Sequence, residues 1–253
     1  MKVALFVTCL ADLFFPEVGK SVVRVLEEQG VEVDVPLSQT CCGQPAYNSG
    51  YPQESREAAR HFVRTFEPYL ECDWAIVLPS GSCAAMIREV YPTLLAEEPE
   101  LLEKALLIRE RVYEFSEYFV HVLGVEKIQA AYPAKATVHH SCHMGRMLGL
   151  REEPLKVLAQ VEGLELVPLS NAEDCCGFGG TFAVKMPQIS TAMGEEKLQH
   201  IRKTGADVVV ASDLGCLMHL SGLARRQGQP LVCKHVAQIL AEGEDGRGAG
   251  HRT

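Results

Sequence analysis

The chain has 253 residues, with 24 Lys and Arg against 33 Asp and Glu and a formal net charge of −9. This acidic balance gives no general attraction for nucleic acid or anionic membranes, so neither is expected as a partner. Hydrophobic residues make up 47% of the chain, which suits a globular core, and no apolar run reaches the roughly 20 residues of a membrane helix. The short apolar start at residues 1–7 lacks the cleavage site of a signal peptide, so we expect a cytoplasmic protein.

The 10 cysteines are too few for a disulfide scaffold. In a cytoplasmic protein they indicate metal ligands or redox groups first. Eight of them form two copies of one pattern: a lone cysteine, a Cys-Cys-Gly segment and another lone cysteine. Equivalent cysteines lie 133 or 134 residues apart, which indicates an internal duplication. The eight are Cys9, Cys41, Cys42, Cys83, Cys142, Cys175, Cys176 and Cys216. Cys72 and Cys233 lie outside the repeat, and we expect them to be structural thiols.

Short apolar runs alternate with segments of helical periodicity through the first half. The pattern predicts strands at 3–8, 31–35 and 74–78. It predicts helices at 16–29, 52–70 and 82–90. A helical insertion, either a hairpin or one long helix, is expected at about 98–123.

The second half repeats this order. Strands are predicted at 136–140, 165–169 and 207–211, with a last edge strand at 231–233. Helices are predicted at 153–161, 187–203 and 214–226. The alternation predicts an α/β fold of two pseudo-symmetric halves with short parallel sheets. The expected divisions are 1–131, 132–241 and a flexible tail at 242–253.

Each repeated cysteine follows the carboxyl end of a predicted strand. In an open parallel sheet these ends form one rim, where such folds bind ligands, so four thiols should converge in each half. Four thiols suit a [4Fe–4S] cluster or a Cys₄ zinc ion. The chain has no Cys-x-x-Cys segment, the spacing that zinc sites usually use, and adjacent cysteines suit a cluster with several irons. We therefore predict one or two [4Fe–4S] clusters, with a zinc-stabilised scaffold as an alternative.

Four segments of the chain resemble a known family. They lie at 41–45, 79–83, 140–143 and 175–180, and they resemble the cysteine-rich (CCG) domain of iron–sulfur oxidoreductase subunits. This domain occurs in heterodisulfide reductase and in the iron–sulfur subunits of glycolate oxidase and anaerobic glycerol-3-phosphate dehydrogenase. The resemblance covers about residues 1–240. It implies an electron-carrying subunit of a complex that oxidises L-lactate to pyruvate, with lactate utilization proteins B and C as partners.

One departure from the family affects the expected chemistry. The disulfide-reductase branch has Cys-x-x-Cys at the end of each motif, whereas this chain has Ser80 and Asp213 at the earlier position. Ser80 and Asp213 are therefore weak candidates for iron ligands, and helix caps are the expected role. Four thiols per site favour an ordinary cubane cluster. Disulfide reduction at the cluster is the alternative function.

Histidines cluster beside Cys142. His139, His140 and His143 flank this cysteine, and a histidine can replace a cysteine on a cluster and raise its potential. With four cysteines already available, we expect a hydrogen bond to the site or simple packing, and His143 is a weak candidate ligand. The chain shows no motif for a nicotinamide or a flavin, so hydride chemistry is assigned to a partner.

Overall fold

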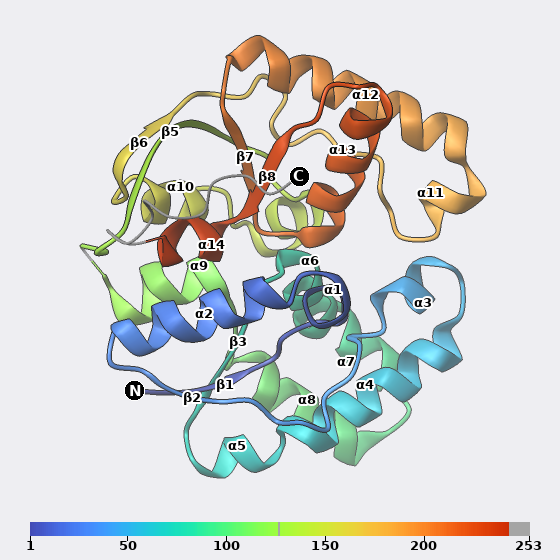
Figure 1. The fold of residues 1–253 in the computed structure, drawn as a ribbon. Coiled ribbons are helices and arrows are strands. Elements are labelled where there is room, and N and C mark those ends of the chain that lie inside the picture. The colour runs from blue at the N-terminus through green and yellow to red at the C-terminus, as the bar shows by residue number, and fades with distance from the viewer. Residues whose placement is uncertain (126, 243–253) are drawn as a thin grey trace.

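The computed structural model describes residues 1–125 and 127–242 (Figure 1). The tail predicted at 242–253 therefore lies outside the described residues, apart from Glu242. The first half contains β1 (Lys2–Leu5), α1 (Cys9–Phe14), α2 (Pro16–Glu28), β2 (Glu32–Asp34), α3 (Gln44–Asn48), α4 (Pro52–Phe66), α5 (Pro68–Glu71), β3 (Ala75–Leu78), α6 (Gly81–Ala85), η1 (Met86–Val90), α7 (Tyr91–Leu94), α8 (Pro99–Arg109), β4 (Val112–Glu114), α9 (Phe115–Glu117) and η2 (Tyr118–Leu123), where η marks a π-helical turn.

The second half begins at the fifth strand. It contains β5 (Ala131–Val138), η3 (Met144–Leu148), α10 (Glu153–Leu158), β6 (Glu162–Leu166), α11 (Phe182–Lys185), α12 (Pro187–Thr204), β7 (Val208–Ala211), α13 (Leu214–Arg226), β8 (Val232–His235) and α14 (Val236–Ala241). Each half has one four-stranded sheet, in the order β2-β1-β3-β4 and β6-β5-β7-β8. All strand pairs are parallel. The predicted α/β fold with two similar halves is thus confirmed.

The duplication extends to the hydrogen-bond register of the sheets. In the first sheet Val3 pairs with Ala75, and in the second Ala136 pairs with Val208. Both members of the second pair lie 133 residues after their counterparts. The same backbone frame therefore carries both sets of cysteines.

Three local predictions need correction. The helix predicted at 52–70 is two helices, α4 and α5, because Pro68 starts a new helix and lacks the N–H that a continuous helix would need. The segment 98–123 is not wholly helical, since the short strand β4 lies within it and forms the edge of the first sheet. The second half's first strand begins at Ala131 rather than at residue 136.

A shared hydrophobic core joins the two halves. The helices α2, α9 and α14 lie between the two sheets (Figure 1), and α2 is amphipathic, with a buried face that includes Val22 and Leu26. This core combines Leu5 and Val22 of the first half with Val138 and Val236 of the second. Burial of this shared apolar surface holds the halves in a fixed relation. Within the described ranges, no helix is both long enough and apolar enough to cross a membrane.

Candidate metal centre

The four repeated cysteines of the first half converge beyond the carboxyl ends of β1, β2 and β3. Cys9 opens α1 and Cys83 lies in the first turn of α6, while Cys41 and Cys42 precede α3. The Sγ atoms of Cys9 and Cys41 are 3.5 Å apart, and those of Cys42 and Cys83 are 3.3 Å apart. The thiols of Cys41 and Cys42 also contact each other, which links the two pairs into one group of four. The fold thus brings together residues that are up to 74 positions apart in the sequence.

The second half repeats the arrangement. Cys175 contacts both Cys142 and Cys176 through its thiol, and Cys176 contacts Cys216 in the first turn of α13. The exposure is also repeated, because the second cysteine of each Cys-Cys pair and the last cysteine of each set are buried, whereas the other two are partly exposed. Each half therefore has a thiol group with one open side.

In each set the first cysteine of the Cys-Cys pair has a pKa that is strongly lowered by thiol donors beside it. The pKa of Cys41 falls to about 3, because Cys42 and Cys9 donate to its sulfur. In the second half the pKa of Cys175 falls to about 2, because Cys142 and Cys176 donate to it. The pKa values of the donating thiols rise accordingly, helped by burial. Each set is thus arranged to stabilise negative charge on sulfur, the form that binds metals.

The glycine of each Cys-Cys-Gly segment is required by the backbone. Gly43 has φ +84° and Gly177 has φ +90°, a region that L-residues rarely adopt. A Cβ on Gly177 would lie 2.4 Å from the carbonyl oxygen of Ser190. This turn lets each glycine donate its N–H to the first cysteine of its pair, at 3.4 Å from Gly43 to Cys41 and 3.3 Å from Gly177 to Cys175.

Ser80 and Asp213 hydrogen-bond to each other across the two halves. The Ser80 hydroxyl donates to Asp213 Oδ1 at 2.7 Å and accepts from the Cys83 N–H at 3.2 Å, so Ser80 caps α6 as predicted. The prediction that Asp213 caps its own helix is wrong, since its side chain makes no cap bond to α13. Instead it accepts from the hydroxyl and the N–H of Ser82, at 2.7 and 3.2 Å, at the start of α6.

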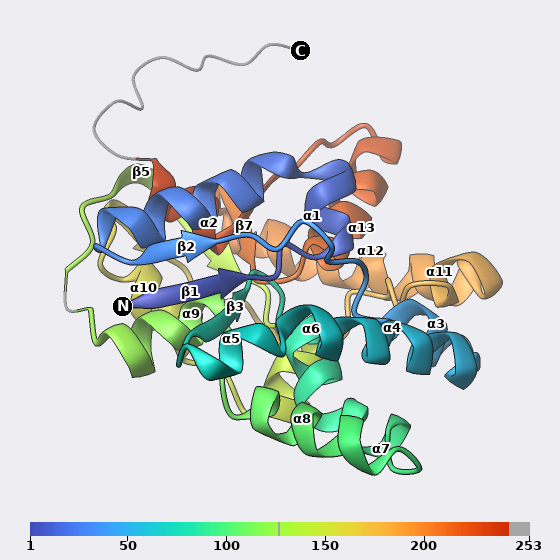
Figure 2. The same ribbon diagram turned by 90° about the horizontal axis from the view of Figure 1, so that it is seen from below.

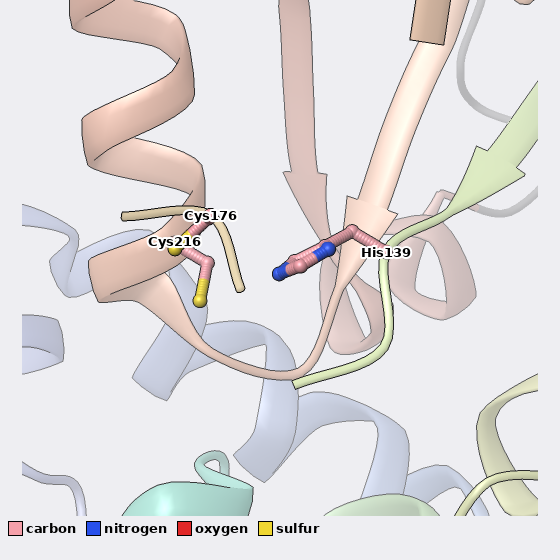
Figure 3. Close-up of side chains that lie close together, drawn as sticks. All are labelled: His139, Cys176 and Cys216. Carbon is pink, nitrogen blue, oxygen red and sulfur yellow. The ribbon is translucent and has the colours of Figure 1, made fainter. Parts of the chain in front are cut away.

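The histidines near Cys142 take different positions. His143 Nδ1 lies 3.6 Å from Cys142 Sγ, so this weak candidate does reach a cysteine of the set. His139 is more deeply placed: its ring points from the end of β5 toward Cys176 and Cys216 (Figure 3), and the ligand atoms of these three residues lie within 4.8 Å of one another. The pKa of Cys216 falls to about 6, mainly through Cys176 and also through the nearby His139.

Lys197 belongs to the site, although the sequence patterns did not indicate it. It is 2% exposed on α12, and its ammonium donates to the carbonyl oxygens of Asn171 and Ala172. Its charge also interacts with the thiols of Cys175, Cys176 and Cys216. A weak signal was available in the sequence, because Lys197 lies beside Leu198 and four residues before Ile201 on the buried face of the helix, and lysine is rarely buried without a partner.

Cysteines of both sets, all except Cys41, line one cavity of about 360 Å³ between the halves. Its wall also includes Gln44 and Pro45 at the start of α3, and Thr181 and Val184 around α11. Figure 2 shows α3 and α11 at the same end of the molecule, where the hydroxyls of Ser49 and Thr181 are 2.6 Å apart. The two sites are therefore parts of one composite centre.

Comparison with known proteins agrees with this duplicated centre. The family described as a cysteine-rich domain (CCG) matches the chain twice, at residues 3–88 and 136–221. A crystal structure of a hypothetical protein from Helicobacter pylori has the same fold, with a TM-score of 0.64 at 14% identity, and the match covers 99% of this chain and 49% of that one. The fold and the site thus define a protein with two cysteine-rich domains.

Curated relatives show to which family of cysteine-rich domain proteins the chain belongs. Lactate utilization protein A 2 of Bacillus cereus (strain Q1) is 49% identical over 243 residues, covering 96% of this chain and 99% of the relative. Lactate utilization protein A 1 of Bacillus mycoides (strain KBAB4) is 50% identical over 242 residues, covering 96% and 97%. The chain belongs to the lactate utilization protein A family.

Proposed function

We propose that this chain binds one [4Fe–4S] cluster in each half and carries electrons in a multisubunit complex that oxidises L-lactate to pyruvate. The observation that carries the proposal is the pair of four-thiol sets, each with one open side, around a common cavity. Clustered thiols suit metal or iron–sulfur binding, and four thiolates per set match the ligands of a cubane cluster. The names of the relatives supply the link to lactate.

The chemistry divides between this chain and its partners. Oxidation of lactate to pyruvate breaks the C–H and O–H bonds at carbon 2 and releases two electrons and two protons. The chain has no nicotinamide or flavin motif, so we assign the removal of these electrons to a partner subunit, with lactate utilization proteins B and C as the proposed partners. This chain's cysteines then hold the centres that accept electrons singly.

The side chains at Ser80 and Asp213 argue against disulfide reduction. That chemistry was the alternative because a related branch has a fifth cysteine at this position. Here the two side chains bond to each other and to α6. Their oxygens are thus engaged as structural groups rather than free for an iron.

A zinc site is the second candidate, because one specific observation favours it. His139, Cys176 and Cys216 have ligand atoms within 4.8 Å of one another, and zinc accepts such a nitrogen and sulfur set. The first half has Phe6 at the position equivalent to His139, so this alternative predicts one zinc ion per chain. Zinc and cluster binding therefore differ in both metal and stoichiometry.

The test is iron, acid-labile sulfide and zinc per chain after anaerobic reconstitution, with absorbance and EPR spectra on the same sample. Two cubane clusters give about eight iron and eight sulfide, and one gives about four. We expect Cys42→Ala and Cys176→Ala each to lose half of the iron, because each removes a buried ligand from one set. Cys72→Ala is the matched control, since Cys72 is exposed and outside the repeat. Stoichiometric zinc without iron would refute the proposal.

A further inference from the structure

The two cysteine sites share a backbone but differ in their surroundings. Phe6 and His139 directly follow the equivalent strands β1 and β5, and each donates its backbone N–H to the neighbouring strand at 2.9 Å, to Val77 and Val210. They are therefore the same position in the two halves. At this position the first half has an aromatic ring and the second has an imidazole.

Two further positions differ in the same way. Ser55 and Ser190 are equivalent, because each donates its hydroxyl to the carbonyl of the glycine in its Cys-Cys-Gly segment. Phe62 and Lys197 each lie seven residues after these serines, so they are equivalent as well. The residues after Cys9 and Cys142 are Leu10 and His143. Three apolar side chains of the first half are thus replaced by three nitrogen-bearing side chains in the second.

The two phenylalanines of the first half pack together. The rings of Phe6 and Phe62 meet edge to face with centroids 5.1 Å apart, and both are buried in the same core as Cys42 and Cys83. These rings have no N–H or charge to offer to sulfur. The side of the first site that faces this core is therefore apolar.

The nitrogen groups of the second half lie near the thiols. His139 is 1% exposed, and within the described part of the chain neither of its ring nitrogens has a hydrogen-bond partner. A buried polar group without a partner is costly, and its ring points at the Cys176 and Cys216 sulfurs (Figure 3). Lys197 adds a buried positive charge, and His143 lies 3.6 Å from Cys142.

These differences should change the reduction potential of the two sites in a definite direction. Reduction adds an electron to an already anionic thiolate-bound cluster, so N–H donors and nearby positive charge stabilise the reduced state and raise the potential. The glycine N–H donors to Cys41 and Cys175 occur in both halves, so they do not contribute to a difference in potential between the two sites. Two acidic residues oppose the effect of the nitrogen groups. Asp174 is exposed, so solvent and salt screen its charge. The buried carboxylate of Asp213 acts on Cys216, but it also accepts from Ser80 and Ser82 beside the first set, so its charge lies between the two sites.

We propose that the second-half site holds its cluster at a higher reduction potential than the first-half site, with His139 as the main positioning donor and Lys197 and His143 in support. The inference rests on the proposed function. One electron then passes from the reduced cluster of the first half to the oxidised cluster of the second half. The transfer oxidises the first cluster and reduces the second. No bond is made or broken, and electrons entering at the first half move toward the second.

The experiment measures each centre separately by EPR-monitored redox titration of the reconstituted full chain. Cys42→Ala leaves the second site intact, and Cys176→Ala leaves the first. We expect the second site to have the higher midpoint potential. His139→Phe, which copies the first half, should lower the ratio of reduced to oxidised second-site cluster at least tenfold at fixed potential, or 59 mV for one electron. Leu10→His is the converse of His143→Leu, because Leu10 and His143 occupy equivalent positions, and it should raise the potential of the first site.

The outcomes are distinct. If His139→Phe fails to load a cluster, Lys197→Met and His143→Leu test the same ordering through smaller decreases in potential. A second-site potential equal to or below that of the first site would overturn the inference, as would variants that load fully and leave it unchanged. Strong nitrogen hyperfine coupling, absent in His139→Phe, would mean that His139 ligates iron and would overturn its assignment as a donor. Absence of iron from both single-site variants would instead refute the proposed function itself.

Discussion

The Ser80 hydroxyl donates a 2.7 Å hydrogen bond to the carboxylate of Asp213, its own counterpart 133 residues later in the repeat. Both side chains are buried, with 6% and 4% exposure. Ser80 and Asp213 therefore occupy the same position in the two copies of the motif and contact each other across the interface between the halves. A carboxylate in place of a second serine makes this contact a charge-assisted hydrogen bond, which is stronger than a neutral one.

Removal of this contact should destabilise the protein without removing a metal ligand. Hydrogen bonds to charged groups contribute about 1.5–3 kcal/mol, so Ser80→Ala should lower the free energy of unfolding by about that amount. A double-mutant cycle with Asp213→Asn, followed by urea unfolding of the metal-free protein, measures the coupling. We expect iron content after reconstitution to stay at the wild-type level in Ser80→Ala. A loss of iron there would identify Ser80 as a ligand.

Gly177→Ala should be strongly destabilising. Alanine at φ +90° is strained, which costs about 1–3 kcal/mol, and its Cβ would also overlap the Ser190 carbonyl at 2.4 Å. Gly228→Ala separates the two causes, because Gly228 has φ +68° with nothing within 4 Å of the added Cβ. Thermal unfolding of both variants should show the larger loss in Gly177→Ala. Equal losses would mean that the close approach to Ser190 has no energetic consequence.

Thr8→Gly should stabilise the protein. Thr8 precedes Cys9 with φ 74° and ψ 147°, a region that is essentially restricted to glycine and costs about 1–3 kcal/mol for other residues. Glycine removes this strain, while its greater freedom in the unfolded chain costs less than about 1 kcal/mol. We therefore expect a higher melting temperature. Ser141→Gly is the matched control in the second half, since Ser141 is not among the positive-φ residues, and it should lower the melting temperature.

Glu114 should make stability depend on pH. Its carboxyl group is fully buried at the start of α9, and this burial raises its pKa to about 8. Between pH 4.5 and 8 the unfolded chain loses this proton while the folded protein keeps it. The free energy of unfolding therefore falls as pH rises, by about 1.4 kcal/mol per pH unit, and the loss levels off above pH 8.

The measurement is the difference in urea stability between wild type and Glu114→Gln from pH 5 to 8. The wild type should lose stability relative to the variant as pH rises. His235, the corresponding cap of α14 in the second half, has its pKa lowered to about 4 by burial. His235 changes stability in the opposite direction, because its stabilising contribution is lost as pH falls below 6.5. Both proteins contain His235, so its contribution cancels in the difference between them. A constant difference across this range would show that Glu114 is ionised in the folded protein.

The duplication, the eight repeated cysteines and the parallel α/β architecture follow from the amino-acid sequence alone. Cysteine spacing is independent of folding, and strands and helices of ordinary length carry their own periodicity. The order of elements also predicted that the cysteines follow strand ends, because parallel strands share one rim. The resemblance to the cysteine-rich family was likewise visible in the segments around Cys42 and Cys176, and the comparisons confirmed it.

How the halves meet depends on packing that no local pattern encodes. The short strand β4 lies between the helices α8 and α9, and its pairing with β3 defines it. The contact of Asp213 with Ser80 depends on how the two halves pack against each other. The position of His139 and Lys197 beside the second thiol set depends on packing within the second half, where α12 lies against α13. Local sequence specifies which groups are available, whereas packing over long sequence separations decides which of them meet.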